Sequence, residues 1–138
     1  FLRISKKPIM LHRDIRTPHM VVVLDPSLLL NIDVTDGLAD GGIVLVNTCD
    51  SADSLKKKLN KKNCKIYTIN AKGIAMRIIG RDLPNTAIMG AIIKLVPLIP
   101  YEHAVEETRE KFSRKLGDEL TEKNIEALKE GYKIEIGN

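Results

Sequence analysis

Three short apolar runs, each followed by polar or turn-forming residues, mark the first half of the chain. The first is HMVVVLDP, His19–Pro26, which is rich in β-branched side chains and stops at a proline that cannot donate to a sheet ladder. A continuous apolar run is typical of a strand that helices cover on both faces, so we expect this run to be the central strand. The runs Ile43–Asn47 and Lys65–Asn70 predict two further strands.

Polar stretches with helical spacing separate these runs. Asp50–Lys62 carries Leu55 and Leu59 four positions apart, which predicts a surface helix with a narrow apolar stripe. Ala71–Gly80 predicts a second helix that stops at its glycine, and Ser27–Leu30 predicts a short helical turn. Strands that alternate with helices imply right-handed crossovers over a parallel sheet.

The pattern changes at residue 85, after which helices dominate. Asn85–Val96 is apolar nearly all round and begins with a good N-cap residue, so the helix is expected to be buried on most sides. It either packs under the sheet or meets another subunit. Small residues allow a close approach between helices, so we predict a subunit interface at Ala87, Gly90 and Ala91.

Two more helices follow. In Tyr101–Leu116, apolar side chains recur every three or four positions opposite charged ones, which predicts an amphipathic helix. We expect Thr121 to cap the N-terminus of a last helix. The segment Tyr132–Ile136 could form a further strand. The inward side chains of that last helix are expected to be Ile125, Leu128 and Tyr132.

These patterns predict a single α/β domain over residues 1–138. A mostly parallel sheet with helices on both faces would occupy residues 1–80, and a helical C-terminal part would occupy residues 85–132. The chain starts at Phe1, within what looks like a strand, so we expect a fragment or one piece of a longer chain.

The first residues are less regular. Phe1–Ser5 and Pro8–Leu11 are β-like, and the intervening Lys6-Lys7 could be an exposed hairpin tip. The polar segment that follows carries Arg13 and Arg16, three positions apart. A helical turn would set both on one face, where they could hold a phosphate or carboxylate; the alternative is a solvated loop.

Charge and composition exclude some classes of protein. The 138 residues carry a net charge of only +4, with three Tyr, two Phe and no Trp, so nucleic-acid binding is disfavoured and the basic groups are interpreted as solvated. Apolar runs stay shorter than the ~18 residues of a membrane span. We expect a cytoplasmic protein that does not enter a membrane.

Signatures of an active site are missing from the sequence. Phosphate-loop, dinucleotide and nucleophile-elbow motifs do not occur, and the three histidines are scattered. Cys49 and Cys64 could form a disulfide, although two reduced thiols are the simpler interpretation, and two thiols alone cannot hold an iron–sulfur cluster. We therefore predict no catalytic residue and no metal site in this chain.

An alternative function is a free-standing α/β module that binds a nucleotide or a small acid. Open parallel sheets bind ligands at the carboxyl ends of their strands. In this sequence that edge would present Asp25, Asn47 and Asn70. A purely structural adaptor is a third interpretation.

Several segments together resemble a known family: FLRISKKPI, PHMVVVLDPSLL, DGGIVLVN, NTAIMGAIIKL and LTEKNIEALKEGY. They are similar, in order and spacing, to the gamma subunit or gamma domain of 2-oxoacid:ferredoxin oxidoreductases. The resemblance is closest to the pyruvate type, also called pyruvate synthase. It runs from Phe1 to about Tyr132.

The resemblance implies a structural subunit within a larger enzyme. Such complexes oxidatively decarboxylate a 2-oxoacid with coenzyme A and reduce ferredoxin, or run the reverse reaction. Thiamine diphosphate with magnesium would lie in the alpha and beta subunits, and iron–sulfur clusters in the beta and delta subunits. The alpha, beta and delta subunits would be the partners of this chain.

This sequence departs from the family at its start. The family's initial strand and its glycine-rich GxGGQG turn do not precede Phe1 here, so we expect the sheet to be incomplete. Within the resemblance, Arg13, Arg16 and Lys6 or Lys7 are candidates for holding the phosphates of coenzyme A at a subunit boundary, because a diphosphate needs fixed positive charge.

Overall fold

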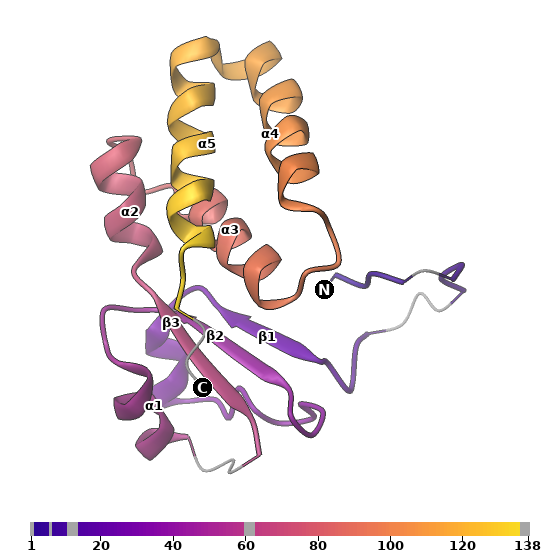
Figure 1. Cartoon of the computed structure of the whole chain (residues 1–138). Coiled ribbons are helices and arrows are strands. Elements are labelled where there is room, and N and C mark those ends of the chain that lie inside the picture. The colour runs from indigo at the N-terminus through magenta and orange to yellow at the C-terminus, as the bar shows by residue number, and fades with distance from the viewer. Residues whose placement is uncertain (1, 6, 11–13, 60–62, 136–138) are drawn as a thin grey trace.

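A three-stranded sheet and a set of helices beside it make up the fold (Figure 1). The computed structural model describes residues 2–5, 7–10, 14–59 and 63–135. The strands are β1 (Met20–Val23), β2 (Ile43–Asn47) and β3 (Lys65–Ile69). The helices are the 3₁₀ helix η1 (Pro26–Leu30), α1 (Ala52–Lys58), α2 (Ala71–Ile78), α3 (Asn85–Leu95), α4 (Tyr101–Leu116) and α5 (Asp118–Tyr132).

The strands are parallel and lie in the order β1-β2-β3, which confirms the predicted parallel sheet. The central strand is β2, however, and not β1. Val44, Leu45 and Val46 are fully buried, whereas three of the four residues of β1 are only half-buried. The prediction that His19–Pro26 is central is therefore wrong for the described residues, in which β1 pairs with β2 alone.

Helices cover both faces of the sheet, as predicted. Side chains alternate between the faces along a strand, so Val44 and Val46 pack against Leu55 of α1 while Leu45 packs against Ala91 of α3. The sheet therefore separates two apolar layers, one built with α1 and one with α3.

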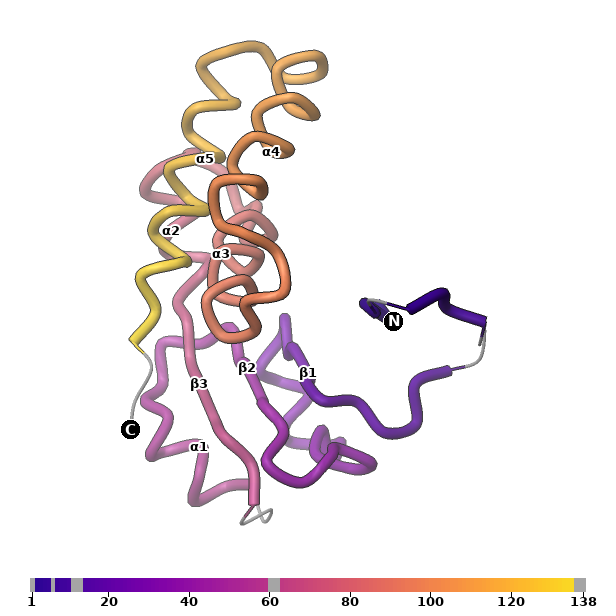
Figure 2. Tube along the Cα trace, turned by 45° about the vertical axis from the view of Figure 1, so that its right-hand side comes forward, coloured from indigo at the N-terminus to yellow at the C-terminus, as the bar shows by residue number. Residues whose placement is uncertain are grey.

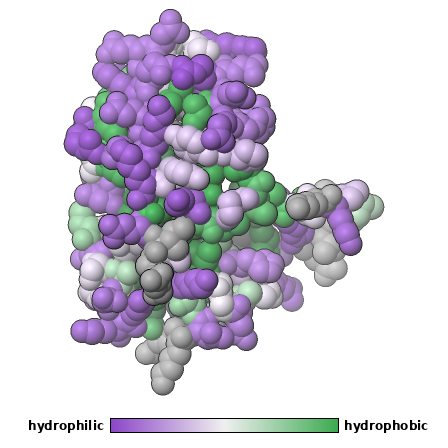
Figure 3. Space-filling model, viewed as in Figure 1, coloured by the Kyte–Doolittle hydropathy of each residue, from purple (hydrophilic) through white to green (hydrophobic). Residues whose placement is uncertain are grey.

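The last two helices form an arm that extends away from the sheet (Figures 1 and 2). Gly117, with φ +76°, makes the turn between α4 and α5. Figure 3 shows hydrophilic residues over this arm and hydrophobic ones gathered where the helices meet the sheet. The arm thus has a more hydrophilic surface than the region where the helices meet the sheet.

Caps explain where several helices begin. The side chain of Ser51 accepts a hydrogen bond from Ser54 N at 3.3 Å at the start of α1, and Asn70 Oδ1 accepts one from Gly73 N at 2.8 Å at the start of α2. Asn85 is not a cap, because Pro84 occupies that position.

Two predictions about the C-terminal end are also wrong. Thr121 lies inside α5, where its Oγ1 donates to Gly117 O at 2.7 Å, because the helix already starts at Asp118. The helix continues to Tyr132, and Ile134 and Glu135 do not form a strand. Ile136, the end of that predicted strand, lies outside the described residues.

The predicted strands at the N-terminal end do not form in residues 2–5 and 7–10. This segment extends away from the helices and the sheet in both views (Figures 1 and 2). Leu2 is 75% exposed and Met10 is 83% exposed, so the segment buries too little apolar surface to hold a hairpin. Phe1, Lys6 and Leu11, which belong to the same prediction, lie outside the described residues.

Candidate functional site

The carboxyl edge of the sheet is tied together by one amide side chain. Asn47, at the end of β2, donates from Nδ2 to Leu24 O at 3.1 Å and accepts at Oδ1 from Ala71 N at 3.0 Å. It therefore links the segments that follow β1 and β3. Sequence reasoning placed Asn47 at this edge but proposed a ligand for it, because an asparagine that bridges backbone and one that binds ligand have the same sequence pattern.

The other two polar residues of this edge are caps. Asp25 Oδ1 accepts from Ser27 N at 2.9 Å, and this backbone hydrogen bond holds the pKa of the Asp25 carboxyl below its ordinary value. Asn70 caps α2. All three predicted ligand groups thus have hydrogen-bond partners within the chain, which weakens the small-ligand alternative.

The predicted arginine pair is only partly described. Arg16 is exposed and lies in an irregular segment, so the residues from Asp14 to Pro18 form a loop and no helical turn. Its carbonyl group lies against Gly37, where a Cβ would come within 2.3 Å of Arg16 O. Arg13 lies outside the described residues.

The tightest helix contact in the described chain joins α3 and α5. A Cβ on Gly90 would lie 2.1 Å from Leu128 O, and a Cβ on Gly131 would lie 1.8 Å from Ala87 O. Both glycines are required by this close approach, since a side chain on either would collide with backbone of the other helix. Ala87 and Ala91 are fully buried beside them.

The predicted interface at Ala87, Gly90 and Ala91 therefore needs correction. A helix does approach closely there, but it is α5 of the same chain, and the three residues are buried beneath it. The missing signal was Gly131, which lies four positions after Ala127 and so presents a matching small face on α5.

A polar and aromatic cluster extends this contact towards α4. The rings of Tyr101 and Tyr132 lie 4.4 Å apart between centroids, and Lys94 Nζ lies 4.9 Å from the centre of the Tyr132 ring. Burial raises the pKa of Tyr101, and the negative charge of the nearby Glu102 raises it further. The cluster joins the start of α4 to the ends of α3 and α5.

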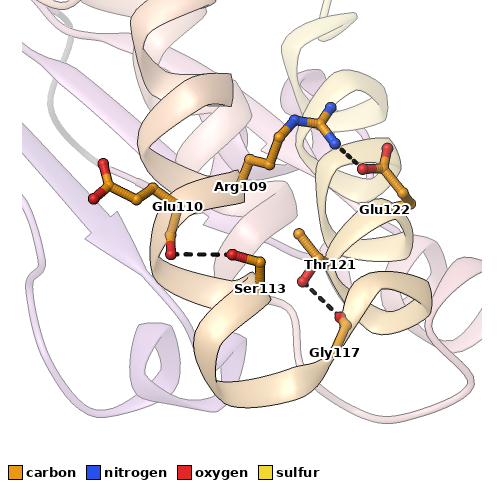
Figure 4. Close-up of polar contacts among 6 residues, drawn as sticks. All are labelled: Arg109, Glu110, Ser113, Gly117, Thr121 and Glu122. Carbon is orange, nitrogen blue, oxygen red and sulfur yellow. Dashed lines mark hydrogen bonds and ion pairs between the residues drawn. The ribbon is translucent and has the colours of Figure 1, made fainter.

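Further along the arm, α4 and α5 are joined by surface side chains. The guanidinium of Arg109 pairs with the carboxylate of Glu122 across the two helices (Figure 4). Ser113 Oγ donates to Glu110 O within α4 at 3.3 Å. This end of the arm therefore has an exposed polar contact in place of a close backbone contact.

A hollow lies along the outer edge of β3, between α1 and the segment after α5. Lys56, Lys65 and Lys133 line it, but Lys56 pairs with Asp53 at 3.3 Å and Lys133 pairs with Glu130. Its positive charge is thus largely matched by carboxylates.

Metal-binding and membrane-spanning features are not found in the part of the chain that the structure describes. Among those residues, no three His, Cys, Asp or Glu side chains gather as a metal site would require. Cys49 is exposed and Cys64 half-buried, and no disulfide joins them. No described helix has the length and hydrophobicity to cross a bilayer.

Residues 1–134 match the family model described as "Pyruvate ferredoxin/flavodoxin oxidoreductase". The chain is 47% identical over 132 residues to the "Pyruvate/ketoisovalerate oxidoreductases common subunit gamma" of Thermococcus kodakarensis, covering 96% of this chain and 69% of that protein. It is 36% identical over 132 residues to the "Pyruvate synthase subunit PorC" of Methanothermobacter marburgensis, covering 96% of this chain and 68% of that protein.

A solved structure shares the fold. The crystal structure of pyruvate oxidoreductase subunit PORC (EC 1.2.7.1) from Thermotoga maritima matches with a TM-score of 0.77 and 32% identity. The match covers 87% of this chain and 65% of that one, so the present chain spans about two thirds of the length of these relatives.

Proposed function

The chain belongs to the pyruvate ferredoxin/flavodoxin oxidoreductase family, and from that premise we propose that it is the structural gamma subunit of a 2-oxoacid:ferredoxin oxidoreductase complex. The observation that carries the proposal is the similarity to gamma subunits along nearly the whole chain. The complex would convert pyruvate, coenzyme A and two oxidised ferredoxins to acetyl-CoA, carbon dioxide, a proton and two reduced ferredoxins, or run in reverse.

The cofactors would belong to the other subunits. The chain has two cysteines in all, whereas the common iron–sulfur clusters take four thiolate ligands, so its donor set does not fit a cluster. We propose alpha and beta subunits that hold thiamine diphosphate and magnesium, and beta and delta subunits that hold the clusters. The cytoplasm remains the proposed location, which cell fractionation would test.

The contribution of this chain would be a rigid shape. The α3–α5 contact leaves no space for either helix to slide, since backbone atoms meet at Gly90 and Gly131. Asn47 fixes the carboxyl edge of the sheet by linking its strands. A scaffold of this kind can hold partner surfaces at constant spacing without supplying a reacting group.

Binding of coenzyme A is a second and narrower proposed role for this chain. We retain Arg13 and Arg16 as candidates for its phosphates, supported by the exposure of Arg16. Reversing both charges should then raise the KM for coenzyme A in the assembled complex and leave the KM for pyruvate unchanged. An unchanged KM for coenzyme A would rule this role out.

A pull-down from the native cell tests the main proposal. The tagged chain should recover larger, cluster-bearing subunits, and the eluate should reduce a redox dye only when both pyruvate and coenzyme A are added. Replacing pyruvate by 2-oxoisovalerate or 2-oxoglutarate would identify the preferred 2-oxoacid. A monomer that recovers no such partners and binds a nucleotide would favour the alternative of a free-standing binding module.

A further inference from the structure

An exposed apolar cluster follows strand β1. Leu24, Leu28, Leu30 and Ile32 are 55%, 43%, 81% and 56% exposed, although they lie within nine consecutive residues. We call these four side chains the η1 patch.

The local geometry keeps this cluster at the surface. Leu29, in the middle of η1, packs against the core layer that contains Val23 and Leu55. A 3₁₀ helix has three residues per turn, so the neighbours Leu28 and Leu30 must diverge to either side of the inward Leu29. The chain cannot turn them inward without exposing Leu29 instead.

The charged residues nearest to the η1 patch in the sequence are aspartates. From Thr17 to Leu55 there is no lysine or arginine, and every charged side chain is an aspartate, although the whole chain carries a net charge of +4. Asp25 and Asp33 accept hydrogen bonds from Ser27 and Thr35, so both carboxylates are held in place beside the patch. Asp36 is exposed and lies in the same turn as Asp33, since its N–H donates to Asp33 O at 3.2 Å. Asp40 lies at the other edge of the sheet, because the adjacent Ala39 N–H donates to Pro18 O.

Two exposed apolar side chains of the helical part have a different setting. Met76 and Leu83 are 49% and 48% exposed, but they lie singly among Lys72, Arg77 and Arg81. Isolated apolar side chains are normal on a protein surface, whereas a cluster with a charged rim marks an interaction site.

We propose that the η1 patch is the docking surface through which this chain binds another subunit of the oxidoreductase complex, and that the partner presents an apolar ridge flanked by lysine or arginine. The inference rests on the proposed function, which supplies the complex. The four side chains expose roughly 400 Å² of apolar surface, about half of what one partner contributes to a standard interface. The patch thus fits the apolar core of an interface whose rim includes Asp25, Asp33 and Asp36.

The same charges argue against symmetric pairing of two copies of this chain. An isologous contact would bring one set of aspartates against the other, and like charges at an interface oppose association. A basic partner instead gains attraction that steers its approach.

The test uses the full chain expressed in its native cell with the other subunits. Leu28→Asp combined with Leu30→Asp should lower the recovery of partner subunits at least tenfold. Leu83→Asp, at an exposed leucine outside the η1 patch, is the matched control and should leave recovery unchanged. Circular dichroism should show the same helix content for both variants, because Leu28, Leu30 and Leu83 are all exposed and none belongs to the buried core.

A second variant probes the rim without changing an apolar side chain. Asp36→Lys, beside Asp33 in the turn after the η1 patch, should slow association severalfold at low salt and reduce its dependence on salt concentration, since exposed charges act within a Debye length. Unchanged association rates at low salt would contradict the proposed charge complementarity.

The outcomes separate the two proposals. If the wild-type chain recovers no oxidoreductase subunits, the proposed function fails. If it recovers them and the Leu28/Leu30 variant does so equally, only the docking surface is overturned. A wild-type dimer that the same variant converts to a monomer, with partner recovery intact, would also overturn it by assigning the η1 patch to a second copy of the chain.

Discussion

Helix α5 packs against α3 on one side and α4 on the other, through two different kinds of contact. Against α3, backbone meets backbone, because Gly90 and Gly131 lack side chains where the helices cross. Against α4, the described contacts include an exposed ion pair between Arg109 and Glu122, and Ala104 is the buried residue of α4. The fold is therefore expected to depend strongly on the first contact and weakly on the polar part of the second.

The two contacts also differ in what they can contribute to function. The α3–α5 contact is buried and uncharged, so it can fix the geometry of the domain but cannot bind a partner. The α4 side of the arm is charged and exposed, so it can change without loss of the fold. A scaffold needs both kinds of region.

The largest effect is expected at the α3–α5 contact. Replacing an ordinary glycine within a helix by alanine raises the unfolding free energy of the protein by about 1 kcal/mol. Gly131→Ala should instead lose about 2 to 3 kcal/mol of unfolding free energy, because its Cβ would lie 1.8 Å from Ala87 O and the helices must separate. Urea denaturation measures the difference.

Gly80→Ala, at the end of α2, is the matched control for that substitution. Its Cβ would meet nothing within 4 Å, so only its positive φ of +76° opposes the change, at a cost of about 1 kcal/mol. If Gly131→Ala proved more stable than the wild type, the close contact would be contradicted.

A smaller effect is expected in α4. Phe112 lies eight positions after the buried Ala104, on the same face of the helix, and is half-buried. Phe112→Ala should lose about 1.5 kcal/mol, less than a fully buried phenylalanine would. Hydrogen exchange should then accelerate in α4 before α3; equal acceleration in both helices would mean that α4 is part of the same cooperative core.

The exposed ion pair should matter still less. Arg109→Ala and Glu122→Ala should each change the unfolding free energy by about 0.5 kcal/mol or less, since solvent screens both groups. A double-mutant cycle over the two positions measures their coupling. A coupling above about 1 kcal/mol would place this contact alongside the α3–α5 crossing.

The smallest expected effect is a dependence of stability on pH, which arises at the C-terminal end of α5. The hydrogen bond from Lys133 lowers the pKa of Glu130 from its ordinary value of 4.5, with a further contribution from Arg77. A lowered folded-state pKa stabilises the fold above pH 4.5, and that stability is lost as the pH falls through the lowered pKa. The melting temperature of the wild type should therefore fall slightly as the pH falls through that range, and the melting temperature of Glu130→Gln should not. Identical pH profiles for the two proteins would contradict this prediction.

Sequence patterns predicted most elements because local spacing determines them. The runs at β2 and β3 and the amphipathic period of α4 need no knowledge of distant residues. The choice of central strand failed, since β1 and β2 are equally apolar and only pairing distinguishes them. Thr121 was misassigned because Gly117, with its positive φ, lets α5 start four residues earlier.

The candidate site was harder to predict than the fold. The small face of α3 was identified, but its partner is 44 positions further on, where Gly131 fits against Ala87. Asn47 gives no local signal that it bridges Leu24 and Ala71, which are distant in the sequence. Long-range contacts of this kind depend on how the elements pack, which a local pattern does not contain.

Reconstitution tests the central claim most directly. The purified chain, supplied with pyruvate, coenzyme A, thiamine diphosphate, magnesium and a redox dye, is predicted to show no turnover. When it is added to the other subunits purified without it, dye reduction should appear and saturate at a fixed stoichiometry. Turnover by the chain alone, or full activity of the other subunits in its absence, would contradict a scaffold role.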